Sequence, residues 1–77
     1  MPLRPYLLDL CAPLSDRRMR ALSALENMEV GETLLLELDR DPEPLLNELK
    51  PVFEEGFSFW VVEEGPKIWR VLITREE

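Results

Sequence analysis

The sequence contains no histidine and a single cysteine, Cys11. The Ser-His and Cys-His arrangements that activate many nucleophiles are therefore excluded, because both need an imidazole base. A zinc site made of cysteine and histidine within one chain is excluded as well, and a lone cysteine cannot form an internal disulfide. The carboxylates do not follow the spacing of a calcium loop. We therefore expect no metal and no cofactor, and the sequence favours a non-catalytic role.

Basic residues are also scarce. The sequence has nine Lys and Arg residues and sixteen Asp and Glu residues, which gives a formal net charge of −7. Nucleic acids and anionic membrane surfaces both need a basic face on their protein partner, so neither is an expected partner. No apolar run approaches the ~20 residues that span a membrane, and no basic-then-apolar leader is visible. These features predict a cytoplasmic protein.

The length of 77 residues predicts one domain over residues 1–77 with a thin core, which suits a shallow surface site better than a deep cavity. Alternating or continuous apolar residues predict strands at 6–10, 33–38, 57–62 and 68–74, with a hairpin turn over 63–67. The first of these strands is apolar almost throughout, which is typical of burial on both faces.

Two segments between these strands carry apolar residues at helical spacing. The first helix is predicted from an N-cap at Ser15 to about residue 28, and the second from an N-cap at Asp41 to Gly56. Their apolar stripes consist of Ala21, Leu22, Leu25 and Met28 in the first helix, and of Leu45, Leu46, Leu49, Val52 and Phe53 in the second. The order βαβαββ with right-handed crossovers predicts an α+β, two-layer sandwich, in which both helices cover one face of a four-stranded sheet.

Cys11 is the one candidate nucleophile. A reactive thiol could carry sulfur or sense oxidants, and the nearby Arg17, Arg18 and helix start would lower its pKa and favour the thiolate. A free cysteine is also commonly a small apolar residue of a partly buried loop, and this second interpretation is the one that we favour.

Arg18 and Arg40 precede or open the two helices, at the end of the sheet where ligands of α/β proteins usually bind. Together with Ser15 and Asp41 they could form a shallow site for a small anion, such as a carboxylate, a phosphate or an oxidised sulfur species. The alternative is that both guanidinium groups pair with neighbouring carboxylates, for which Asp9, Asp16, Asp39 and Asp41 are available.

The sheet face that no helix covers is the third candidate. Alternation assigns seven residues to it: Leu7, Leu35, Trp60, Val62, Ile68, Arg70 and Leu72. An uncovered face usually alternates to polar residues, whereas this one is largely apolar, and contiguous exposed apolar patches usually mark contacts. We expect a homodimer or a protein partner to bind here, the alternative being apolar residues scattered singly over a surface.

Several short strings, in order, resemble the TusA/SirA-like sulfur-carrier superfamily, and most of all its uncharacterised branch of small domains. They are Leu8-Asp9, Gly31-Glu32-Thr33-Leu34, Asp41-Pro42-Glu43-Pro44-Leu45, Gly56-Phe57, and the stretch from Glu63 to Pro66 with Trp69-Arg70-Val71. The resemblance implies the strand order 1-2-4-3, with the last strand antiparallel to the others.

The sulfur carriers bear a Cys-Pro-x-Pro motif at the start of their first helix, and Leu14 stands at the corresponding position here, three residues after Cys11. In the uncharacterised branch, histidines tend to occupy the positions of Arg18 and Arg40. The resemblance therefore implies a small binding or interaction domain, and the alternative is a sulfur carrier in which Cys11 accepts a persulfide sulfur.

Overall fold

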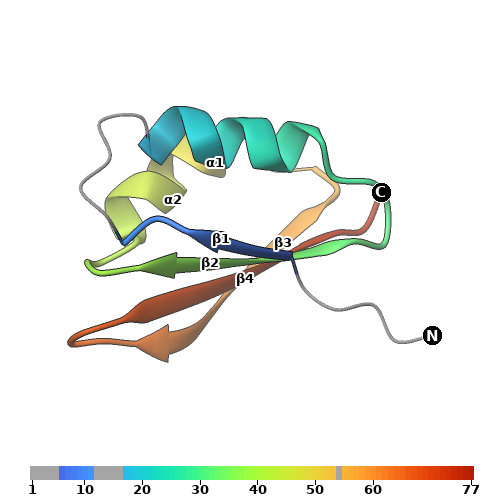
Figure 1. Ribbon diagram of the computed structural model, residues 1–77. Coiled ribbons are helices and arrows are strands. Elements are labelled where there is room, and N and C mark those ends of the chain that lie inside the picture. The colour runs from blue at the N-terminus through green and yellow to red at the C-terminus, as the bar shows by residue number, and fades with distance from the viewer. Residues whose placement is uncertain (1–5, 12–16, 54) are drawn as a thin grey trace.

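The computed structural model describes residues 6–11, 17–53 and 55–77. In chain order they form β1 (Tyr6–Asp9), α1 (Arg17–Glu26), β2 (Thr33–Leu38), α2 (Glu43–Leu49), β3 (Phe57–Glu64) and β4 (Trp69–Arg75). The sheet order is β1-β2-β4-β3; β1 is parallel to β2, and β4 is antiparallel to both of its neighbours. Both helices lie on the same side of the sheet (Figure 1). The predicted α+β sandwich and its strand order are confirmed.

The core lies between the two layers and is centred on β2. Burial alternates strictly along this strand, so that Leu34, Leu36 and Leu38 are buried while the residues between them are half-buried. Ala21 and Leu25 of α1 are fully buried in the same cluster. The apolar stripe predicted for α1 is thus the surface by which this helix packs on the sheet.

The first helix ends two residues before its predicted end. The Asn27 N–H and the side-chain amide of Asn27 both donate to the Ser23 carbonyl, at 3.1 and 2.8 Å, and the next N–H, that of Met28, donates three residues back, to Leu25. Gly31 then adopts a φ of 91°, a conformation that favours glycine, and its N–H donates to the Arg75 carbonyl at 2.7 Å. Ser15, the predicted N-cap, lies outside the described residues.

The second helix is shorter than predicted. Its N-cap is Pro42, one residue after the predicted Asp41, because the helix begins at Glu43. The carboxylate of Asp41 nevertheless accepts the Glu43 N–H at 2.9 Å. It ends at Leu49, because Pro51 has no N–H to donate and its ring clashes with the preceding turn. Val52 is consequently exposed, although Phe53 still reaches the core. Within the described ranges, neither helix has the length and apolar character needed to cross a membrane.

The hairpin differs from the prediction in its turn. Glu63 and Glu64 were expected in the turn, but they pair with Arg70 and Trp69, and a β-bulge between Val61 and Glu63 absorbs the extra residue Val62. The turn is tight at Gly65, where an added Cβ would lie 2.4 Å from the Trp69 ring. The last strand begins at Trp69, one residue after its predicted start.

The prediction that the first strand is buried on both faces is wrong. Leu7 is exposed because no helix covers its face of the sheet in the described part of the chain (Figure 1). Tyr6 lies on the helix side, opposite Leu34, and is exposed at the start of this edge strand. The continuous apolar run of β1 therefore supplies surface as well as core.

We expect Leu25→Ala to lower the free energy of unfolding by about 2–5 kcal/mol, because it leaves a cavity under α1. Met19→Ala, on the exposed side of the same helix, serves as the matched control and should change it by less than ~0.5 kcal/mol. Urea denaturation followed by circular dichroism measures both. Equal losses in the two variants would show that α1 does not pack as described.

Candidate functional site

The uncovered sheet face carries a continuous apolar row. Leu7 of β1 lies opposite Leu35 of β2, Leu35 lies opposite Leu72 of β4, and Leu72 lies opposite Trp60 of β3. Leu7 is 55% exposed and Trp60 63% exposed, while the two central leucines are half-buried. Four of the seven predicted face residues thus form one row across all four strands, which we call the apolar row.

Polar rows border the apolar row on both sides. On one side the register aligns Asp9, Glu37, Arg70 and Glu63, which we call the charged row. On the other side it aligns Thr33, Thr74 and Ser58, the hydroxyl row. Of the remaining predicted face residues, Val62 is exposed in the bulge and Ile68 is half-buried just before β4.

Arg70 organises the charged row. Its Nε donates to Glu37 Oε2 at 2.9 Å, its Nη2 lies 2.9 Å from the same oxygen in an ion pair, and its Nη1 contacts Glu63 Oε1. Hydrogen bonds to Glu37 and then to Glu63 hold the pKa of Arg70 above its ordinary value. One guanidinium group thereby joins the side chains of three adjacent strands and orients the carboxylate of Glu37.

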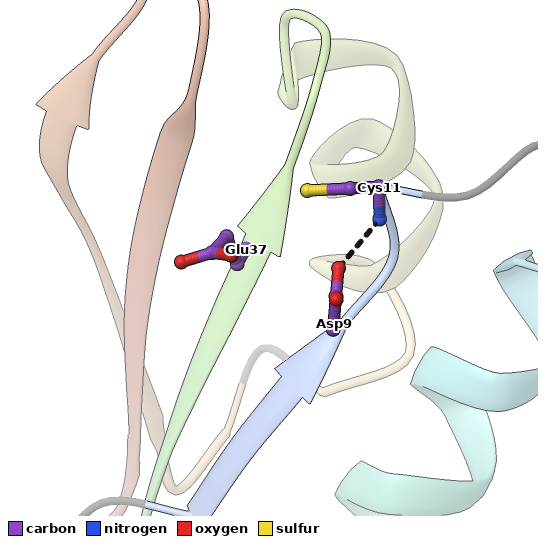
Figure 2. A group of neighbouring side chains, drawn as sticks. All are labelled: Asp9, Cys11 and Glu37. Atoms are coloured by element: carbon purple, nitrogen blue, oxygen red, sulfur yellow. Dashed lines mark hydrogen bonds between the residues drawn. The ribbon is translucent and has the colours of Figure 1, made fainter.

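A thiol and two carboxylates meet where β1 and β2 end (Figure 2). The ligand atoms of Asp9, Cys11 and Glu37 all lie within 4.8 Å of one another, and the Cys11 N–H donates to Asp9 Oδ1 at 2.9 Å. Asp9 and Glu37 are register partners in the parallel pair. The sequence analysis missed Glu37, although its equivalent position in the second predicted parallel strand was the signal that could have found it.

The thiol of Cys11 is not activated. Burial raises its pKa to about 11, and the hydrogen bond to Asp9 and the negative charges of Asp9, Glu37 and Asp39 act in the same direction. The Cys11 N–H in turn lowers the pKa of Asp9. The expected lowering of the thiol pKa by neighbouring arginines is wrong, because burial and then the neighbouring carboxylates raise this pKa.

The structure does bring Arg18, Arg40 and Asp41 to one surface hollow of about 410 Å³, which Arg17 also lines. Each guanidinium group there already has a carboxylate partner. Arg17 and Arg40 bind Asp39 at 3.3 and 3.1 Å, and Arg18 lies 3.5 Å from Glu48. An anion would have to compete with these ion pairs, and binding of an anion at this corner stays a prediction. Ser15, its fourth predicted member, lies outside the described residues.

A larger hollow of about 640 Å³ lies between α1 and the first two strands. Apolar side chains such as Tyr6, Met19 and Met28 make up much of its lining, with Arg20 and Glu32 as its charged members. The sequence analysis did not predict it. Its lining offers contact surface but no grouping of titratable side chains that would support a reaction.

The pKa of Cys11 can be measured from the rate of alkylation by iodoacetamide as the pH rises. We expect the rate in the folded protein to increase up to about pH 11, and that of the chain unfolded in urea to level off near the ordinary value of 9.0. Asp9→Asn should lower the folded-state pKa, because it removes a negative charge and a hydrogen-bond acceptor, whereas Glu76→Gln should not. A wild-type thiol that titrates at pH 9 or below would contradict the geometry.

Comparison with known proteins gives one match. The sequence model of a family described as "Uncharacterized conserved protein (DUF2249)" matches residues 8–75, which is most of the chain and includes β2, both helices, the Cys11 cluster and all of the apolar row except Leu7. Neither a curated protein nor a solved structure matches the chain. This chain therefore belongs to the DUF2249 family.

Proposed function

We propose that this domain is a non-catalytic interaction module that pairs with a second copy of itself through the uncovered sheet face. The apolar row carries this proposal, because it runs across all four strands with Leu7 and Trp60 more than half exposed at its two ends. A contiguous apolar strip on a face that is otherwise bordered by polar rows is typical of a contact surface.

Symmetry favours a second copy as the occupant. A two-fold axis that lies in the interface, parallel to the apolar row, packs the apolar row of one chain against the apolar row of the other, as an isologous contact requires. The same rotation places the charged row of one chain over the hydroxyl row of the other, with Glu37 facing Thr33 and Arg70 facing Thr74. Like charges therefore do not meet across the interface.

The form of the face also fits. The four-stranded sheet has its helices on one side, and its other side is left uncovered by them (Figure 1). Two sheets that pack face to face also resemble the arrangement of a β-sandwich.

The two alternatives from the sequence find less support. Persulfide transfer by Cys11 needs a nucleophilic thiolate, whereas its surroundings raise the thiol pKa. An anion site at the arginine corner must displace the carboxylates of Asp39 and Glu48. A relationship to the TusA/SirA-like proteins stays a proposal.

Sedimentation analysis tests the pairing. We expect the wild-type protein to reach twice the chain mass of 9.0 kDa as its concentration rises, and Trp60→Glu to remain a monomer with an unchanged circular dichroism spectrum. The control is Met19→Glu, which introduces the same charge at an equally exposed position on α1. It should associate like the wild type.

Salt provides a second arm of the same experiment. Each chain carries a net charge of −7, so added salt should screen the repulsion between copies and tighten the pairing. Docking driven by ion pairs with a basic partner would weaken instead. A wild-type protein that stays monomeric at high concentration and high salt, or a control that dissociates like Trp60→Glu, would overturn the proposal.

A further inference from the structure

Three potential metal ligands converge from two adjacent strand ends. Asp9 closes β1, Cys11 follows it after one residue, and Glu37 lies beside Asp9 in β2. Their ligand atoms lie within 4.8 Å of one another, and Figure 2 shows all three side chains at the same end of the parallel pair. A cation placed among them would reach all three with small side-chain rotations. We propose that Asp9, Cys11 and Glu37 bind a thiophilic divalent cation of the Zn²⁺ or Cd²⁺ class.

Hydrogen bonds already orient both carboxylates for this role. Asp9 Oδ1 accepts the Cys11 N–H, and Glu37 Oε2 accepts the Nε–H of Arg70 and forms an ion pair with its Nη2. Each carboxylate thus keeps one further oxygen for a cation. Donors that fix ligating carboxylates in this way are a regular part of protein metal sites, and they distinguish this cluster from a chance group of acidic side chains on a surface.

The two carboxylates beside the thiol favour a cation. Ligand atoms of Asp9 and Glu37 lie within 4.8 Å of the thiol sulfur, so a divalent cation among the three groups would be attracted by both carboxylates. On binding, the S–H bond breaks, the proton passes to solvent, and a sulfur lone pair forms the bond to the metal. No atom is oxidised or reduced. Zinc accepts sulfur and carboxylate ligands together, and water can complete its four-coordinate shell.

The site lies in the charged row, next to the apolar row, and it does not depend on pairing between chains. Its ligands come from a single chain, so a monomeric variant such as Trp60→Glu retains all of them. Metal binding and self-association can therefore fail or succeed separately.

The test uses the full chain and Co²⁺ as a spectroscopic probe, followed by Zn²⁺. We expect one Co²⁺ per chain, with a near-ultraviolet thiolate-to-cobalt absorption band that Zn²⁺ abolishes. Cys11→Ser should lose the band, and Glu37→Gln and Asp9→Asn should each weaken binding about tenfold or more, as the loss of a ligand or its support does. Glu63→Gln is the matched control: Glu63 also contacts Arg70 in the same row, but it lies outside the cluster.

A second readout follows the thiol itself. Bound Zn²⁺ should protect Cys11 from alkylation and release one proton per chain near pH 8, and its apparent affinity should rise with pH as the thiol proton becomes easier to displace. Absence of the band and of protection at millimolar metal would overturn the proposal. An affinity in Glu37→Gln and Asp9→Asn equal to that of the wild type would also overturn it, because the cysteine would then act alone.

Discussion

The alternation of side chains along β2 is the constraint on which the rest of the structure depends. This strand lies between β1 and β4, and its even-numbered leucines, Leu34, Leu36 and Leu38, are at most 1% exposed beneath the helices. Burying each of them contributes about 1.5–3 kcal/mol. A chain of this length has a total stability on the order of 4–12 kcal/mol. A shift of one residue in register would expose all three leucines, so the register of β2 is strongly fixed.

The same alternation determines what the molecule presents to its surroundings. With the even positions buried, Leu35 and Glu37 point outward, and the register extends each of them into a row across the sheet. Leu35 belongs to the apolar row and Glu37 to the charged row. The two proposals of this article, self-association and metal binding, therefore use adjacent rows of one face. The arginines at the helix starts contribute less, because they already form ion pairs with Asp39 and Glu48.

The sequence predicted most features that depend on periodicity. The bounds of β2 and the buried stripe of α1 follow directly from the spacing of leucine and alanine, and the order of elements placed both helices on one face. The strand order came from the resemblance to a known superfamily. Pro51 is itself a sequence signal for the early end of α2. The bulge at Val62 depends on local competition and was missed, and it carried Glu63 from the turn into the sheet.

The candidate sites were predictable to a similar extent. The residues of the apolar row could be identified from the sequence, because this requires only the alternation of side chains along each strand and the order of the strands. The surroundings of Cys11 could not, because the thiol pKa depends on the positions of Asp9, Glu37 and Asp39 in space. Likewise, the sequence offered many carboxylates near Arg18 and Arg40, but only coordinates identify Glu48 and Asp39 as their partners.

The central claim is that the outward face of the sheet becomes buried against a second chain. The most direct measurement is the fluorescence emission of Trp60 as the only tryptophan, in a Trp69→Phe variant, over a wide range of protein concentration. The account predicts that the emission maximum moves to shorter wavelengths as the chains pair, whereas Trp69 alone, in Trp60→Phe, shows no such shift. An emission maximum of Trp60 that stays at the wavelength of a solvated indole at every concentration would contradict the account.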